Sequence, residues 1–88
     1  MLRRGMSSLR KIKIDASAEG CSGMYWRTEP KMSSTSSDPK WPRNGEIHSG
    51  EWMSNVGTEG CRWVKFSNSF WLPEKQAGVT ILFDEGPA

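Results

Sequence analysis

Residues 61–73 read CRWVKFSNSFWLP, and this stretch decides the fold class of the chain. Residues 61–66 are expected as a strand, with Val64 and Phe66 on one face and Trp63 and Lys65 on the other, which is the period of a half-buried β-strand. A Ser-Asn-Ser turn follows, and residues 70–72 form a second apolar run that Pro73 ends, because proline cannot donate to a β-ladder. Two short strands joined by a tight turn predict a β-hairpin, and therefore a β protein.

Further strands are expected on both sides of this hairpin. In residues 11–16, Ile12, Ile14 and Ala16 share one face and the lysines share the other. The other stretches expected as strands are residues 24–28, 46–53 and 79–83. Short antiparallel strands lose their exposed edges when the sheet closes on itself. The expected fold is therefore an all-β, small barrel of five to six short strands.

The segments between these strands are expected to be turns and loops. Residues 33–45, SSTSSDPKWPRNG, form a long Ser/Pro-rich loop in which Trp41 is the one large apolar side chain. Residues 74–78 predict a short turn or a single helical turn, and residues 84–88 predict a fraying C-terminal tail. The expected domain plan is a basic arm at residues 1–10, a barrel at residues 11–83 and this tail.

The composition favours one small binding domain. The chain has 88 residues with 35% hydrophobic residues, but it includes five Trp, three Phe and one Tyr. Each aromatic side chain buries about 150–250 Å², so aromatic rings can fill a core that is short of Leu and Val. A wholly disordered chain is excluded by this aromatic content. Most enzyme scaffolds are larger than this chain, so the size favours a module that binds a partner.

The positive charge is concentrated at the N-terminus. Residues 1–14 hold five Lys/Arg and no acid, whereas residues 15–88 hold seven Lys/Arg and ten Asp/Glu. Nucleic-acid modules usually carry a basic face on the folded part, so this mildly acidic body disfavours nucleic acid. The arm has the composition of an organelle transit peptide, which would imply the mitochondrion. The alternative is a basic tail on a cytoplasmic protein.

The residues that could carry chemistry do not form a known catalytic motif. Cys21, Cys61 and the single histidine, His48, lack the spacing of a metal site, so no metal and no cofactor are expected. The two cysteines predict either a disulfide or two reduced thiols, and the low cysteine count favours thiols. No nucleophile and base can be paired by motif, so the chain is expected not to be an enzyme.

The order of the motifs resembles that of an SH3-like barrel, and more closely the bacterial-type SH3 module and its protist and algal relatives. The matching parts are an aromatic-Arg-x-x-Pro stretch, a Gly-rich hairpin, a Trp-Val-Lys strand, an aromatic-Leu-Pro corner and a last strand, at residues 25–30, 44–52, 62–66, 71–73 and 78–82. The resemblance covers residues 11–83. It implies a five-stranded barrel of two orthogonally packed sheets that contacts other proteins and has no catalytic activity.

The chain departs from the SH3 pattern at the peptide groove. Eukaryotic SH3 domains carry an acidic loop and a pair of tryptophans, whereas here only Glu29 lies near the first loop and Trp63 has no tryptophan beside it. Recognition of proline-rich peptides is therefore not carried over from the family.

Several side chains are candidates for partner binding. If Val64 and Phe66 face the core, alternation turns Trp63 outward and makes it a contact residue. Trp41 either pins its own loop or contacts a partner. The full set of candidates is Arg3, Arg4, Arg10, Lys11, Tyr25, Trp41, Trp63 and Pro73.

The expected function is that of an accessory or assembly subunit on a larger multiprotein complex, associated with an organellar membrane. The partners would be other protein subunits, with the basic arm on an acidic protein surface or an anionic lipid. One alternative is a free SH3-type adaptor that binds proline-rich peptides in a groove of Tyr25, Trp63 and Pro73. A second alternative is an RNA- or ribosome-associated protein that uses the arm.

Overall fold

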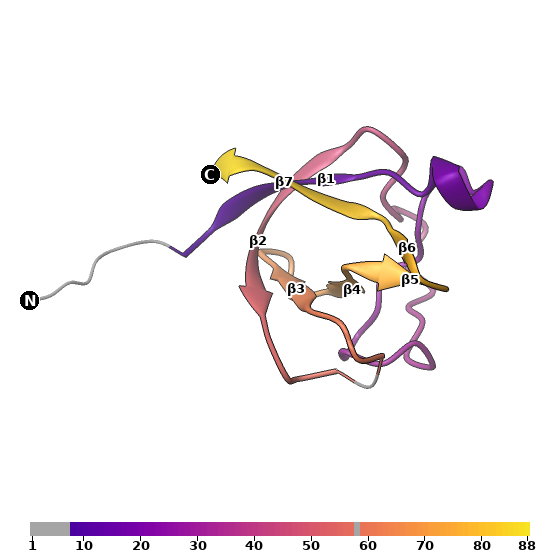
Figure 1. Ribbon diagram of the computed structural model, residues 1–88. Coiled ribbons are helices and arrows are strands. Elements are labelled where there is room, and N and C mark those ends of the chain that lie inside the picture. The colour runs from indigo at the N-terminus through magenta and orange to yellow at the C-terminus, as the bar shows by residue number, and fades with distance from the viewer. Residues whose placement is uncertain (1–7, 58) are drawn as a thin grey trace, which may run out of the picture.

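The computed structural model describes residues 8–57 and 59–88, and it confirms the prediction of an all-β chain. Within these residues the one helical element is a short 3₁₀ turn, η2 (Ser17–Glu19). The strands are labelled in Figure 1 and are β1 (Arg10–Ile14), β2 (Ile47–Met53), β3 (Trp63–Phe66), β4 (Trp71–Pro73), β5 (Lys75–Gln76), β6 (Val79–Thr80) and β7 (Leu82–Pro87).

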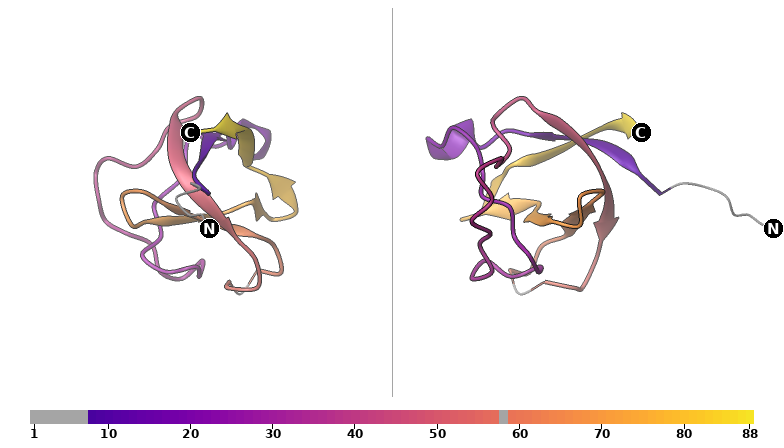
Figure 2. Two further views of the ribbon diagram at one scale, coloured as in Figure 1. Left: turned by 90° about the vertical axis from the view of Figure 1, so that its left-hand side faces the viewer. Right: turned by 180° about the vertical axis from the view of Figure 1, so that it is seen from behind.

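Five of the strands form one antiparallel sheet in the order β4-β3-β2-β1-β7, and β5 and β6 form a separate two-stranded hairpin. The sheet bends strongly, so that β1 and β7 lie across the molecule from β3 and β4 (Figures 1 and 2). In the described residues β4 and β7 do not pair with each other. The sheet is therefore open, and the six stretches expected to pair edge to edge do not form a closed cylinder.

The first and last parts of the described chain pair with each other. Ile12 lies opposite both His48 and Asp84, so β1 sits between β2 and β7. The N–H of Ala88 donates to the carbonyl of Leu9 at 3.1 Å. The expected fraying of residues 84–88 is wrong, because most of this tail belongs to β7. Arg10 likewise belongs to β1 and not to the arm.

Residues 24–28 do not form the strand that their composition predicts. Only isolated bridges occur there, and the strongest pairs Arg27 with Trp71 through two main-chain hydrogen bonds of 2.8 and 3.0 Å. The Arg27 side chain is buried and donates to the hydroxyl of Thr35, which ties the long loop to this segment. Burial lowers the pKa of the Arg27 guanidinium. The segment runs along the outer edge of β4, where one bridge replaces a ladder.

The segment from residue 74 to residue 83 also differs from its expected form. Ala77 and Gly78 both have positive φ, at 52° and 79°, which is the geometry of a tight two-residue hairpin turn. This turn joins β5 to β6, so the short turn expected within residues 74–78 is present and its helical alternative is not formed. The last predicted strand is split at Ile81, whose N–H donates to the carbonyl of Glu74 at 2.9 Å.

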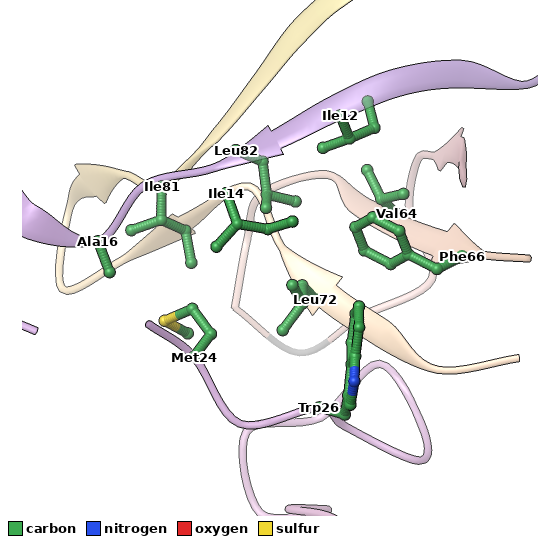
Figure 3. Packing of buried hydrophobic residues seen from close by; sticks show 10 residues of the cluster. All are labelled: Ile12, Ile14, Ala16, Met24, Trp26, Val64, Phe66, Leu72, Ile81 and Leu82. Atoms are coloured by element: carbon green, nitrogen blue, oxygen red, sulfur yellow. The ribbon is translucent and has the colours of Figure 1, made fainter. Parts of the chain in front are cut away.

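The core lies on the concave side of the bent sheet. Ile12 and Ile14 point into it, which confirms the alternation predicted for residues 11–16. Met24 and Trp26 point toward it from a loop outside the sheet (Figure 3). The Trp26 ring stacks on Phe70 and meets Phe66 edge-on, with centroids 5.6 and 5.1 Å away. Aromatic rings thus contribute to the core, but most residues of the buried cluster are aliphatic, so aromatic rings do not take the place of aliphatic side chains as the composition suggests.

Candidate docking surface

Two of the predicted partner-binding residues meet at the rim of one pocket. Tyr25 and Trp41 come from segments 16 residues apart, and their ring centroids lie 6.1 Å apart. Tyr25 is 58% exposed. The pocket has a volume of about 350 Å³ and is lined by Gly20, Cys21, Ser22, Gly23, Met24, Tyr25 and Trp41. We call this the aromatic pocket.

A glycine allows the two pocket segments to approach. Gly23 bridges to Arg43, and the N–H of Met24 donates to the carbonyl of Pro42 at 3.0 Å. A Cβ at residue 23 would lie 2.2 Å from that carbonyl oxygen and 2.6 Å from the Trp41 ring. Only glycine fits at such a distance from backbone, so the sequence feature that shapes the pocket is Gly23.

Asn44 holds the other wall of the aromatic pocket in place. Its side-chain oxygen accepts from the N–H of Ala16 at 2.8 Å, and its amide donates to the carbonyl of Cys21 at 2.7 Å. Its own N–H donates to the carbonyl of Ser22 at 2.9 Å. The Asn-Gly pair, which the sequence marks as a turn signal, therefore also positions the residues that line the pocket. Sequence reasoning missed this role of Asn44.

The chemistry of the aromatic pocket is apolar with a cationic rim. The guanidinium of Arg43 lies 3.7 Å from the centroid of the Trp41 ring and donates to the Trp41 carbonyl. The lining residues include no His, Asp, Glu or Lys. Such a surface can bind an apolar or aromatic group and can attract negative charge beside it.

The expected exposure of Trp63 is wrong. Trp63 is 0% exposed, although it points away from the core cluster that contains Val64 and Phe66, as alternation requires. Gly57 covers it so closely that a Cβ there would lie 2.0 Å from the indole Nε1. Pro73, opposite Trp63 in the register, is also buried. The groove expected from Tyr25, Trp63 and Pro73 is therefore not an exposed surface.

The basic candidates divide between the folded body and the arm. Arg3 and Arg4 lie outside the described residues. Arg10 donates to both carboxylate oxygens of Asp84, at 3.0 and 3.1 Å, which binds β1 to β7. Lys11 is exposed and takes part in no ion pair among the described residues. Of the two, Lys11 is the one whose charge is free for a partner.

Asp84 also links a third strand to this pair. The indole N–H of Trp52 in β2 donates to the Asp84 carboxylate at 2.9 Å. The hydrogen bond from Arg10 is the main reason that the pKa of Asp84 is lowered to about 2, and the N–H of Gly86 adds to this effect. The arrangement holds three strands together and leaves the Asp84 carboxylate with three donors.

A second, more polar pocket of about 440 Å³ lies beside β3 and β5. Its charged residue Arg62 forms a two-point contact with Glu74, with a shortest distance of 2.9 Å, and lies 4.0 Å from the Trp52 ring centroid. The contact with Arg62 lowers the pKa of Glu74. Because Arg62 and Glu74, two of the three charged lining residues, satisfy each other within the protein and only Lys75 remains outside the ion pairs of the described residues, this pocket is a weaker binding candidate than the aromatic one.

The other side chains that could take part in chemistry are two cysteines and one histidine, and each has different surroundings. Both cysteines are free thiols, with Cys21 exposed at the aromatic pocket and Cys61 half-buried. His48 contacts Glu46 at 2.8 Å and meets the Trp26 ring edge-on. Among the described residues, no group of three or more His, Cys, Asp or Glu could hold a metal ion. In the same part of the chain, no helix has the length and apolar character needed to cross a bilayer.

Comparison of the chain with protein-family models, with curated proteins and with solved structures gives no match.

Proposed function

We propose that the protein is a non-enzymatic, SH3-like module that serves as an accessory or assembly subunit, and that it docks on a larger protein complex through the aromatic pocket. The observation that carries this proposal is the convergence of the exposed Tyr25 with Trp41 at the rim of that pocket. Neither ring belongs to the core cluster of the described residues.

The fold supports the SH3-like part of the proposal. Five antiparallel strands form one strongly bent sheet, and residues 24–28 run beside its β4 edge. This arrangement supports an SH3-like relation in strand number and in the bend of the sheet, although the sheet stays open between β4 and β7. The short strands and the long connections between them also support the SH3-like resemblance, which rests on the order of motifs in residues 11–83.

The side chains at the pocket support a binding role. Tyr, Trp and Arg are the residue types that most often carry binding energy at protein interfaces. All three occur here, because Arg43 stacks on Trp41 beside Tyr25. The thiol and hydroxyl in the lining have no acid or imidazole among the other lining residues to activate them, which supports binding over catalysis.

The proposed setting is a complex at an organellar membrane. The support is the run of five basic residues without an acid in residues 1–14, which has the composition of an organelle-targeting segment.

The pocket can be tested with substitutions that keep the fold. The full-length chain, tagged at its C-terminus, is purified natively from its own cells, and co-eluting proteins are quantified by mass spectrometry. We expect the double variant Tyr25→Ala, Trp41→Ala to recover the stoichiometric partners of the wild type in a yield lowered by roughly tenfold or more, as for hot-spot residues.

The matched control is Val56→Ala, which truncates another exposed apolar side chain outside the aromatic pocket. Circular dichroism and thermal unfolding confirm that each variant is folded. Recovery of the same partners in the same yield by the double variant would show that the aromatic pocket is not the docking site.

A further inference from the structure

Three strands present a row of side chains on the outer face of the sheet. Lys13 in β1 lies opposite Phe83 in β7 and opposite Ile47 in β2. Ile12 and Ile14 point into the core, so Lys13 and Lys11 point to the other face. Ile47 is 51% exposed and Phe83 is 41% exposed. We call Lys11, Lys13, Ile47 and Phe83 the outer row.

The outer row combines apolar and cationic groups in a way that suits an interface. Single exposed apolar residues are ordinary, but here two flank one lysine on three paired strands. The methylene stem of Lys13 can lie along such apolar neighbours while its ammonium group extends beyond them. The pairing of the strands holds the three positions in a fixed arrangement (Figure 1).

The charges of the outer row are only partly balanced within the described residues, where Lys13 helps to lower the pKa of Asp15. Lys11 and Lys13 are absent from the ion pairs found in the described residues. The nearby acids Asp15 and Glu46 accept hydrogen bonds from Ser17 and His48. Glu51 in β2, which shares the face of Ile47, and Glu85 in β7 are further acids on the strands that pair with β1, and they oppose the two lysines in part.

The sequence adds further positive charge in the residues that precede β1. Arg3 and Arg4 precede β1, and residues 1–14 contain no acid. With Lys11 and Lys13 they make four basic residues within eleven positions, leaving aside Arg10, which is paired with Asp84. Clusters of four or more basic residues beside an apolar contact surface are typical of proteins that bind anionic membranes.

We propose that the outer row binds the surface of an anionic lipid bilayer, with Ile47 and Phe83 entering the interface and Lys11 and Lys13 contacting lipid headgroups. Anionic lipids can diffuse within a bilayer and gather beside the two lysines of the outer row. A folded protein partner would instead need acidic side chains already placed opposite these lysines. This membrane contact goes beyond the proposed docking role and shares no residue with the aromatic pocket.

The proposal is tested by co-sedimentation of the full-length chain with vesicles. Vesicles of phosphatidylcholine alone are compared with vesicles that also contain phosphatidylserine. We expect the wild-type chain to bind the second kind only, with binding weakened by added salt. Lys11→Glu with Lys13→Glu should weaken this binding by roughly tenfold or more, and Ile47→Ser with Phe83→Ser should weaken it without changing the net charge.

The control double variant is Lys31→Glu with Lys75→Glu, which changes the net charge equally at exposed positions outside the outer row. It should bind vesicles more strongly than the Lys11→Glu, Lys13→Glu variant. Equal loss in both double variants would overturn the outer row as a site, and so would a wild-type chain that stays in the supernatant with phosphatidylserine vesicles.

Two further double variants distinguish lipid binding by the outer row from protein docking at the aromatic pocket and from lipid binding by the basic arm. Tyr25→Ala with Trp41→Ala should bind vesicles as the wild type does, so a failure of protein docking and a failure of membrane binding can be told apart. The double variant Arg3→Glu with Arg4→Glu measures how much of the vesicle binding depends on the basic arm. If that variant abolishes binding while the outer-row variants do not change it, the arm and not the sheet face is the lipid contact.

Discussion

Gly57 lies so close to the indole of Trp63 that it covers this ring, and Trp63 is therefore buried. Trp63 lies on the outer side of β3, where alternation places it, and the segment around Gly57 lies directly over its ring. The distance leaves no room for any side chain at residue 57. A contact residue predicted from the strand pattern is thus buried by a residue from a connecting loop.

We expect Gly57→Ala to destabilise the protein by about 1–3 kcal/mol, because the added methyl group would overlap the Trp63 ring. Urea unfolding followed by tryptophan fluorescence measures the change. The control is Gly78→Asn, since residue 78 has open space around its Cβ position and a positive φ that Asn tolerates. Equal stability of Gly57→Ala and wild type would show that the loop does not cover Trp63.

At the scale of elements, one carboxylate joins three strands. Asp84 in β7 accepts hydrogen bonds from Arg10 in β1 and from Trp52 in β2. The guanidinium of Arg62, which precedes β3, lies over the ring of Trp52. The same guanidinium donates a hydrogen bond to the carboxylate of Glu74. These polar contacts thus link β7, β1 and β2 to the chain that follows β4, in addition to the main-chain pairing and the shared core.

This contact predicts a specific acid sensitivity. The pKa of Asp84 is about 2 in the fold, below its value of roughly 3.9 in an unfolded chain, so its contribution is present above pH 4. That contribution is lost as the pH falls through the folded pKa. We expect Asp84→Asn to be less stable than wild type at neutral pH, with the difference shrinking between about pH 4 and pH 2.

Urea unfolding of both proteins over this pH range measures the difference. Because Asp15, Glu46 and Glu74 also have lowered pKa values in both proteins, their effect cancels in the comparison. A stability difference that stays constant from neutral pH to pH 2 would contradict the role assigned to Asp84.

In the molecule as a whole, a loop contributes residues to the same core as the strands. Met24 and Trp26 lie outside every named strand, and both are buried in the same cluster as residues of β1, β3, β4 and β7. The indole N–H of Trp26 also donates to the carbonyl of Lys40 at 3.0 Å. The long Ser/Pro-rich loop is therefore anchored to the core through one side chain.

We expect Trp26→Ala to cost about 3–5 kcal/mol of stability, as for a tryptophan removed from a core, and to give one cooperative unfolding transition at a lower urea concentration. The neighbouring substitution Tyr25→Ala is the matched control, because Tyr25 is exposed and its loss should change the stability by less than about 0.5 kcal/mol. Similar costs for the two variants would mean that the loop does not share the core.

The strand pattern was largely predictable. Residues 46–53 and 61–66 contain β2 and β3, and residues 11–16 contain all of β1 except Arg10, because alternation between polar and apolar residues is a local property of a half-buried strand. Residues 24–28 and 84–88 were not predictable in the same way. The first has a strand composition but bridges to Trp71 at only one residue, and the second has a tail composition but pairs with β1.

Local alternation and composition were enough to predict the β class of the chain, the core-facing residues of the stretches 11–16 and 61–66 and the presence of aromatic rings in the core. The tertiary structure alone decided that Tyr25 meets Trp41, that Gly57 buries Trp63 and that Arg10 is paired with Asp84. Each of these contacts joins residues that lie in different segments. Their approach depends on how the whole sheet bends and how its loops pack, and no local pattern encodes that.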